Sequence, residues 1–195
     1  VPESLDIYGR ALVERPGDDL CLSKMDELSE IVQSWEGNVP YLKQACEASD
    51  DDLVKQDLTL RMARTYFDKL GDAENAERCF LEVLKFDEEH LESLKALDQI
   101  YLNQTRWDDL VAIIRREIPI VDSDEERIEL NMRLGTILFD MLQKGDEAID
   151  AYNEVLNIEI GHWDALNALE RIYESREDWQ AVYETFDKMA ASSND

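Results

Sequence analysis

The sequence is short of cations. Its 195 residues include 20 Lys and Arg against 46 Asp and Glu, and the formal net charge is −26. A protein that binds a nucleic-acid backbone uses many Lys and Arg to displace counterions, and an anionic membrane surface attracts basic segments. We therefore expect neither a nucleic acid nor an anionic membrane surface as the partner.

Long apolar runs are also lacking. No stretch approaches the ~18–20 apolar residues of a membrane-spanning helix, so we expect no membrane insertion. The first residues, Val1 to Ser4, contain neither a basic nor an apolar region of a signal peptide. We predict a cytoplasmic protein. Because the chain does not begin with Met, we also expect it to be a segment of a longer protein.

Cysteine and histidine are scarce and badly spaced for metal binding. Cys21, Cys46 and Cys79 are an odd, irregular set, which fits neither a disulfide framework nor a zinc site; we interpret them as small core residues in a reducing compartment. His90 and His162 lie one repeat apart, on the order of 20 Å for stacked helices, so they cannot share a metal. We expect each to make a contact at a helix start.

Motifs of catalysis are missing as well. The sequence has no phosphate-binding glycine loop, no G-x-S-x-G and no H-E-x-x-H. Asp122-Ser123-Asp124 begins like a calcium loop, but Arg127 replaces the required glycine. We predict no enzyme, no cofactor and no metal site, with an enzyme-associated regulatory domain as a distant alternative.

What the sequence does contain is a repeat. Trp35, Trp107 and Trp179 lie 72 residues apart (107 − 35 and 179 − 107). Many other residues recur at this offset: His90/His162, Leu94/Leu166, Leu97/Leu169, Ile100/Ile172, Tyr101/Tyr173, Phe67/Phe139, Ala76/Ala148 and Phe80/Tyr152. The chain is thus about two and two-thirds copies of one unit, with boundaries near 1–54, 55–126 and 127–195.

Each copy divides into amphipathic helices. Leu94, Leu97, Ile100 and Tyr101 follow the i, i+3, i+4, i+7 spacing of one helix face, and no segment alternates as a strand would. We predict about eleven helices of 12–20 residues, including 53–70, 73–86 and 127–143. Acidic residues before these stretches predict helix caps: Asp50–Asp52, Asp72 and 122–126. Gly71, Gly145 and Gly161 fall at expected turns.

The spacing resembles that of the tetratricopeptide repeat, whose unit has ~34 residues, close to half of 72. The pattern is carried by Leu166, Leu169, Tyr173, Trp179 and Phe186, and it recurs at Leu94, Leu97, Tyr101, Trp107 and Ile114. Alternate pairs resemble it too, with Ala63, Tyr66, Ala76 and Phe80, and with Gly135, Leu138, Ala148 and Tyr152. The resemblance implies an all-α fold, an α-solenoid in which antiparallel helix pairs form one right-handed superhelix over residues 1–195.

The sequence departs from the family at the point where the two helices of a pair cross. Ala63 and Gly135 keep the small residue, but Asp26, Asp98 and Glu170 replace it elsewhere. We expect these pairs to splay or to turn the carboxylate outward.

The tryptophans allow two interpretations. Trp35, Trp107 and Trp179 could stack on a ligand, or each ring could pack between the helices of a pair, as the large aromatic does in the family. We favour packing for all three and for Trp163.

The resemblance also implies a site, because the first helices of tetratricopeptide pairs line a concave groove that holds a peptide or a partner helix. By spacing, the groove residues are Arg61, Arg64, Lys95, Gln99, Arg133, Asn167 and Arg171. Their basic character would draw in acidic segments. The competing interpretation is that these cations pair with Asp or Glu four residues away on a solvated face.

We therefore predict a non-catalytic scaffold for protein–protein interaction. The alternative is a structural or spacer segment of a longer helical array, which would self-associate through exposed ends.

Overall fold

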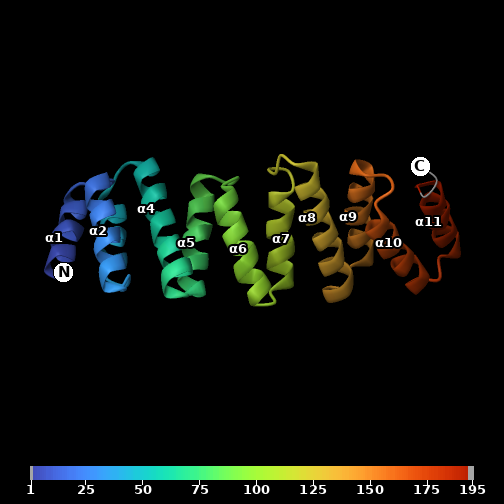
Figure 1. Cartoon of the computed structure of the whole chain (residues 1–195), viewed down its shortest axis with the longest axis horizontal. Helices are drawn as coiled ribbons and strands as arrows, with labels where there is room; N and C mark the ends of the chain where they lie inside the picture. The colour runs from blue at the N-terminus through green and yellow to red at the C-terminus, as the bar shows by residue number, and fades with distance from the viewer. Residues whose placement is uncertain (1, 193–195) are drawn as a thin grey trace. The chain divides into compact units, whose positions relative to one another are not determined.

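The computed structural model describes residues 2–192, which form eleven α-helices, two π-helical segments and no strand. The chain divides into two compact units, residues 1–100 and 101–195. Figure 1 shows that successive helices in each unit run in alternating directions. The elements are α1 (Pro2–Glu14), α2 (Asp19–Val32), α3 (Val39–Ala48), α4 (Asp52–Arg64), η1 (Thr65–Leu70), α5 (Ala73–Phe86), α6 (Leu91–Asn103), α7 (Trp107–Glu117), α8 (Asp124–Thr136), η2 (Ile137–Met141), α9 (Gly145–Ile158), α10 (Trp163–Ser175) and α11 (Trp179–Ser192).

Both units are stacks of helices built on the predicted apolar stripes. In unit 1, α1 packs on α2 and α3, α3 packs on α4, and α4 packs on α5. In unit 2, α7 packs on α8, α8 on α9, α9 on α10 and α10 on α11. The largest buried side chains include Leu12, Met25 and Phe80 in unit 1, and Leu138 and Leu166 in unit 2. The all-α fold of stacked helix pairs is confirmed, while a single continuous domain stays a prediction.

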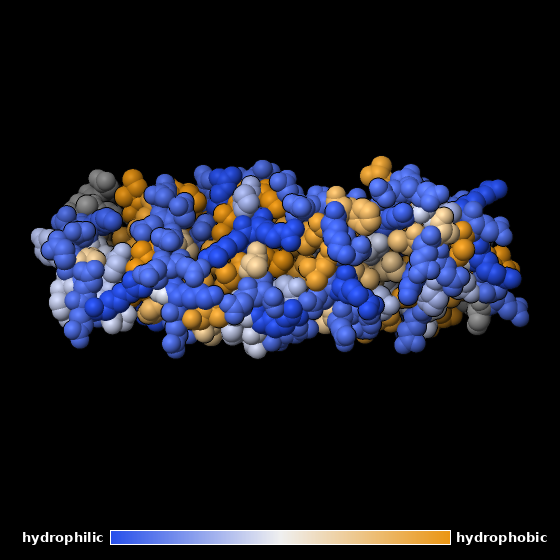
Figure 2. Space-filling model, turned by 180° about the vertical axis from the view of Figure 1, so that it is seen from behind, coloured by the Kyte–Doolittle hydropathy of each residue, from blue (hydrophilic) through white to orange (hydrophobic). Residues whose placement is uncertain are grey.

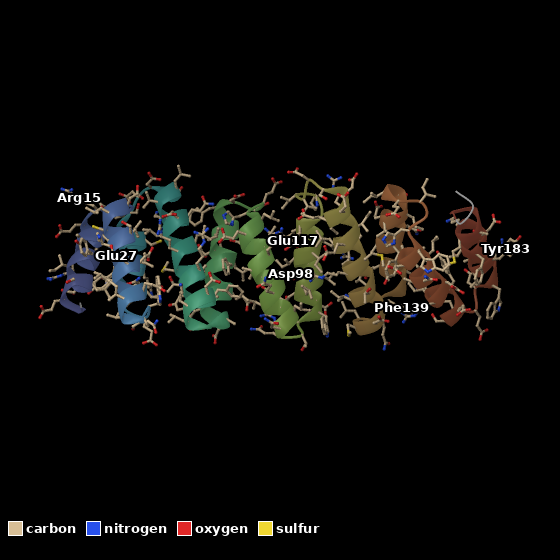
Figure 3. All side chains as sticks on the ribbon, in the orientation of Figure 1. Arg15, Glu27, Asp98, Glu117, Phe139 and Tyr183 are labelled. Carbon is tan, nitrogen blue, oxygen red and sulfur yellow. The ribbon has the colours of Figure 1, made fainter. Side chains whose placement is uncertain are left out.

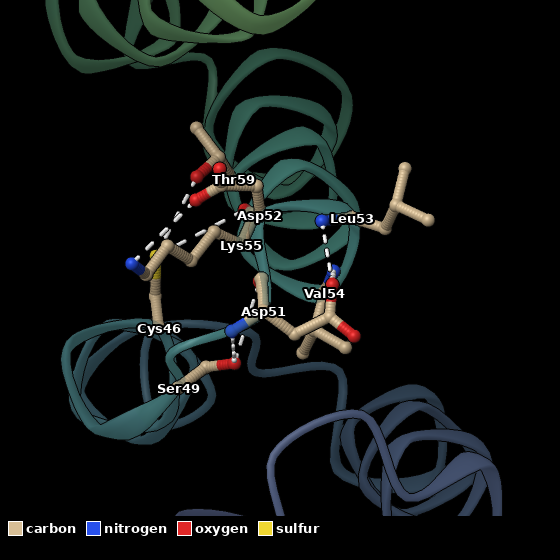
Figure 4. A network of polar contacts seen from close by, with 8 residues as sticks. All are labelled: Cys46, Ser49, Asp51, Asp52, Leu53, Val54, Lys55 and Thr59. Atoms are coloured by element: carbon tan, nitrogen blue, oxygen red, sulfur yellow. Dashed lines mark hydrogen bonds and ion pairs between the residues drawn. The ribbon is translucent and has the colours of Figure 1, made fainter.

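Helix starts follow the capping residues read from the sequence. The Asp51 carboxylate accepts hydrogen bonds from the backbone N–H groups of Leu53 and Val54, at 2.9 and 3.4 Å (Figure 4). Asp72 accepts from the N–H of Asn75 at 3.1 Å. Predicted helices 53–70 and 73–86 are confirmed as α4 with η1 and as α5. The predicted start at 127 is wrong, because Ser123 caps α8 and the helix begins at Asp124.

The two histidines also cap helices, as expected. The Nδ1 atom of His90 accepts a hydrogen bond from the N–H of Ser93, and that of His162 accepts one from the N–H of Ala165, both at 3.2 Å. Each histidine therefore satisfies a backbone donor that the first turn of a helix leaves free.

Left-handed backbone positions recur with the repeat. Gly71 has φ 65°, and Gln143, one repeat later, has φ 56°. Gln33, Thr105 and Glu177 form a second set at the same offset, with φ between 51° and 56°. Gly145 lies next to a turn, as predicted: it is the first residue of α9, and Gln143 in the preceding turn takes the left-handed position.

The helix crossings explain the small residues. A Cβ atom on Gly135 would lie 2.6 Å from Cζ of Tyr152 on α9, so only glycine fits without movement. Ala63, its counterpart, is fully buried. The carboxylates that replace them behave differently from one another. The Asp26 side chain is half exposed, as expected, whereas Asp98 is 6% exposed, so outward placement is wrong there.

The α4 and α8 helices both end in a π-helical segment. η1 and η2 begin one repeat apart, at Thr65 and Ile137. The Thr65 hydroxyl donates to the carbonyl of Arg61 at 2.8 Å, and the Thr136 hydroxyl donates to that of Met132 at 2.9 Å. A π-helical turn changes the direction in which the following side chains point, so the face that residues 66–70 present could not be read from a 3.6-residue period.

Packing of the tryptophans is only partly as expected. Trp35 and Trp107 are half buried, but Trp163 and Trp179 are 56% and 65% exposed. The prediction that all four lie in the interior is therefore wrong for these two. In Figure 2 hydrophilic residues cover most of the visible face, with apolar residues between them.

No helix among residues 2–192 is both long enough and apolar enough to cross a membrane.

Candidate functional site: a groove on unit 1

The face formed by α2, α4, η1 and α6 in unit 1 carries two adjoining hollows. The first, of about 220 Å³, lies between α2 and the α4–η1 helix. Its apolar floor is Leu22, Met25 and Leu42, all nearly inaccessible to solvent. Its remaining lining is Asp26, Trp35, Asn38, Arg61, Arg64, Thr65, Asp68 and Lys69.

The second hollow, of about 440 Å³, lies between α4–η1 and α6. Its lining is Arg64, Phe67, Asp68, Phe80, Leu91, Glu92, Lys95, Ala96 and Gln99. Because Arg64 and Asp68 line both hollows, the two adjoin, and we call them together the unit 1 groove.

The two walls of the second hollow are joined by an ion pair. The Arg64 guanidinium donates from Nε and Nη2 to the two carboxylate oxygens of Glu92, at 2.6 and 2.5 Å. This hydrogen bonding raises the pKa of Arg64 and lowers the pKa of Glu92, because each charged form stabilises the other. The pair fixes the position of Arg64 between the hollows.

A second pair links the walls of the first hollow. Arg61 on α4 lies 3.5 Å from the Asp26 carboxylate on α2 and 3.0 Å from Asp57 on its own helix. Partial burial raises the pKa of Asp26, and the positive charges of Arg61 and Lys69 oppose that rise.

Trp35 and Lys69, which both line the first hollow, contact each other. The Lys69 ammonium lies 4.7 Å from the centroid of the Trp35 ring and 3.6 Å from the Glu30 carboxylate. A cation at this distance is attracted by the ring face. The half-buried indole therefore borders the hollow, so both interpretations of this tryptophan retain some support.

The groove is nearly neutral in a strongly acidic chain. Arg61, Arg64 and Lys69 face Asp26 and Asp68 in the first hollow, an excess of one positive charge. In the second, Arg64 and Lys95 balance Asp68 and Glu92. The chain as a whole carries −26. The unit 1 groove therefore carries less negative charge than the chain as a whole.

The competing interpretation of these cations is only partly right. Arg61 does pair with Asp57, four residues away. Three further ion pairs reach neighbouring helices: Arg61 pairs with Asp26, Arg64 with Glu92 and Lys69 with Glu30. Most of these ion pairs therefore connect the helices on the two sides of the groove, and only the pair of Arg61 with Asp57 lies within one helix.

All four groove residues predicted in unit 1 line the unit 1 groove. Arg61 lines the first hollow, Arg64 lines both hollows, and Lys95 and Gln99 line the second. In unit 2, Arg133 is half buried on α8 and Asn167 is half buried on α10. Arg171 lies 3.2 Å from Asp140 and 5.7 Å from the centroid of the Phe139 ring, which Figure 3 labels.

Sequence reasoning missed several residues of the groove. Phe67, Asp68 and Lys69 lie on η1, whose π-helical turn carries no clear sequence signal. For Trp35, packing was favoured over the ligand-stacking interpretation. On α2, Lys24 and Glu27 pair with each other at 2.5 Å (Glu27 is labelled in Figure 3).

Among the described residues, no group of three or more His, Cys, Asp and Glu side chains could hold a metal ion.

Comparison with known proteins supports the repeat. A family model described as "Tetratricopeptide repeat" matches residues 93–128 and 165–195. These segments begin 72 residues apart (165 − 93) and correspond to α6–α7 and α10–α11. The matched residues are about a third of the chain.

Solved structures of similar fold include YrrB, described as a TPR protein with an unusual peptide-binding site. It has a TM-score of 0.52 at 18% identity, over 96% of this chain and 91% of that one. A MamA crystal structure has a TM-score of 0.51 at 17% identity, over 100% of this chain and 94% of that one. At these identities the likeness shows a shared fold.

Proposed function

Because the chain is a tetratricopeptide-like repeat protein, we propose that it is a non-catalytic scaffold whose unit 1 groove binds a segment of a partner protein. Tetratricopeptide repeats generally serve as interaction scaffolds, and YrrB, of similar fold, is described as having a peptide-binding site. The observation that carries the proposal is the pair of adjoining hollows, with an apolar floor and fixed cations between them.

The chemistry of the groove favours a particular kind of segment. The floor of Leu22, Met25 and Leu42 accommodates an apolar side chain. Arg64 and Lys69 at the rim offer charged donors to a neighbouring carboxylate. The ligand is therefore an extended or helical segment with an apolar side chain next to an acidic residue. Because the groove is nearly neutral, it does not repel the carboxylate of that residue.

The test begins with peptides selected by display against the full chain. Affinities of the selected peptides are then measured by calorimetry for Arg64→Gln and Trp35→Leu. We expect Arg64→Gln to weaken binding about tenfold or more, because a charge-assisted hydrogen bond contributes roughly 1.5–3 kcal/mol. Trp35→Leu should weaken it about three- to tenfold, because an aromatic contact contributes roughly 0.5–1.5 kcal/mol beyond the area it buries.

The matched control is Lys85→Gln on α5, which removes a cation whose side chain is 70% exposed and lies outside the groove. It should leave the affinity unchanged. Equal affinities for the wild type, Arg64→Gln and Trp35→Leu would overturn the proposal. Circular dichroism of each variant excludes a general loss of structure as the cause of weaker binding.

A structural role in self-assembly is the second candidate, favoured by the exposure of Trp179 and Tyr183 on α11. It requires self-association that grows with concentration. Sedimentation velocity at several concentrations distinguishes the two, because a peptide-binding scaffold stays monomeric without its ligand.

A further inference from the structure

One polar side chain on the lining of the first hollow is almost completely buried. Asn38, between α2 and α3, lines this hollow and is only 1% exposed. Asparagine is a common helix-capping residue, because its side-chain oxygen can accept a hydrogen bond from the first turn of the helix that follows. Asn38 precedes α3 directly, but its side chain makes no such bond. Something other than its own helix therefore holds this side chain.

The hydroxyl of Ser29 holds the Asn38 side chain instead. Ser29 on α2 is fully buried, and its Oγ donates a hydrogen bond to Oδ1 of Asn38 at 2.9 Å. This bond engages the oxygen end of the amide, so the nitrogen end, Nδ2, is turned away from Ser29.

The Nδ2 atom is the part of Asn38 that remains available to a ligand. The backbone N–H of Asn38 donates to the carbonyl of Trp35, and the Asn38 carbonyl accepts from the N–H groups of Tyr41 and Leu42. Among the described residues, Nδ2 has no hydrogen-bond partner. It is not sealed in the interior, because no fully enclosed side-chain nitrogen in this part of the chain lacks a partner. Its two N–H donors therefore open into the first hollow, which Asn38 lines.

A donor in this position favours a ligand that brings an acceptor. Leaving a buried donor without a partner is unfavourable, and most such groups in folded proteins are hydrogen-bonded. The hollow of about 220 Å³ is several times the ~30 Å³ that one water molecule occupies in the liquid. It therefore has room for a large side chain that carries an acceptor to Nδ2.

The lining restricts which side chain can carry that acceptor. The apolar floor of Leu22, Met25 and Leu42 favours an apolar body. A carboxylate is disfavoured there, because Arg61 and Arg64 are already paired with carboxylates of this chain and a charge buried against apolar groups is costly. A phenol combines an apolar ring with a hydroxyl oxygen that accepts a hydrogen bond.

We propose that the first hollow takes a tyrosine side chain of the partner segment, whose hydroxyl oxygen accepts a hydrogen bond from Nδ2 of Asn38. This inference rests on the proposed function, because it names the side chain that the unit 1 groove selects. Ser29 is a positioning residue, which holds the amide so that Nδ2 faces the hollow. The Asp26 carboxylate lines the same hollow and is an acceptor for the hydroxyl proton. Phenylalanine has the same ring but leaves Nδ2 without a partner.

The test combines two forms of the full chain with two forms of a peptide. Peptides are selected from a displayed random library and kept where Arg64→Gln weakens their binding, which places them in the unit 1 groove. We expect Tyr to be enriched at one position of these peptides. Each peptide is then made with Tyr and with Phe at that position, and calorimetry with the wild type should favour Tyr about tenfold. Enrichment of Phe or Leu in place of Tyr would overturn the inference.

The second form of the chain carries Ser29→Ala with Asn38→Leu. Replacing both partners of a buried hydrogen bond by apolar groups of similar shape leaves no unmet donor or acceptor, so the fold should persist, which circular dichroism checks. In this variant Phe should bind as tightly as Tyr. Ser29→Ala alone should reduce the preference for Tyr to about threefold, because Asn38 is then less firmly oriented. The matched control is Ser23→Ala, which removes an exposed hydroxyl of the same helix and should leave the tenfold preference unchanged.

The inference and the proposed function fail in different ways. If peptides depend on Arg64 but bind equally well with Tyr and Phe, or if the preference for Tyr persists in the double variant, the inference is overturned and the proposed function stands. If no selected peptide depends on Arg64, the proposed function fails, and p-cresol and toluene then test the hollow alone. Of these two, only p-cresol should shift the side-chain NH₂ signals of Asn38 in NMR spectra of the full chain; unmoved signals would overturn the inference.

Discussion

Gly135 offers a sharp test of the helix packing, because its replacement by Ala has two opposing effects. Alanine is about 1 kcal/mol better than glycine inside a helix. Against this, the new Cβ would lie 2.6 Å from Cζ of Tyr152, where carbon atoms need about 3.5–4.0 Å. The ring must move by roughly 1 Å, and overpacking of this kind costs about 1–3 kcal/mol. We expect Gly135→Ala to be net destabilising by about 1 kcal/mol.

The other copy of the repeat supplies a rescue. There the same crossing is made by Ala63 and Phe80, both almost inaccessible to solvent. In the second copy, the Tyr152 hydroxyl lies within hydrogen-bond distance of the Thr136 hydroxyl, at 3.2 Å, which restrains the ring. Tyr152→Phe added to Gly135→Ala should therefore recover at least half of the lost stability.

Urea denaturation followed by circular dichroism measures these differences. Gly145→Ala is the control, because its new Cβ meets only the end of the flexible Arg176 side chain; it should be neutral or stabilising by up to about 1 kcal/mol. If Gly135→Ala is as stable as the wild type or more stable, the close crossing inferred between α8 and α9 is wrong.

Three further outcomes follow from the local geometry. Thr105 is a β-branched residue with φ 54°, a backbone conformation that glycine adopts more easily. Thr105→Gly should therefore raise the free energy of unfolding by about 1 kcal/mol, which urea denaturation measures. Since Arg64 lowers the pKa of Glu92 below its usual 4.5, that pair stabilises the fold above this pH and loses its effect as pH falls through the lowered pKa. At neutral pH the wild type should be more stable than Glu92→Gln by less than about 1 kcal/mol. Denaturation measured at decreasing pH should show this difference disappear in acid. Burial raises the pKa of the Cys79 thiol, so its alkylation at neutral pH, followed by mass spectrometry, should be slower than that of a free thiol; equal rates would contradict the burial.

Much of the fold could be predicted because equivalent residues recur in successive copies of the repeat, so that the same helix pattern is seen more than once. The caps Asp51 and Asp72 determine where α4 and α5 start, and a carboxylate before an apolar period is visible in the sequence. The start of α8 was missed because Ser123 lies within an acidic run, where any of several residues could cap.

The groove was less predictable. Arg61, Arg64, Lys95 and Gln99 could be placed by helical spacing because they precede the π-helical turn or lie on a regular helix. Lys69 follows the start of that turn, so spacing alone could not assign its face.

The tryptophans show a different limit. Trp179 occupies the same repeat position as Trp107, but it is 65% exposed whereas Trp107 is half buried. Periodicity gives the side of the helix on which a residue lies. Whether that side is covered depends on tertiary neighbours, which the local pattern does not specify.

The central claim is that the unit 1 groove binds a peptide segment, and an NMR titration tests it most directly. A selected peptide is added to the isotope-labelled full chain, and the indole N–H of Trp35 is followed together with the backbone amides. We expect saturable shifts at Trp35 and along α2, α4, η1 and α6. Shifts confined to other surfaces, with Trp35 unmoved at saturation, would contradict it.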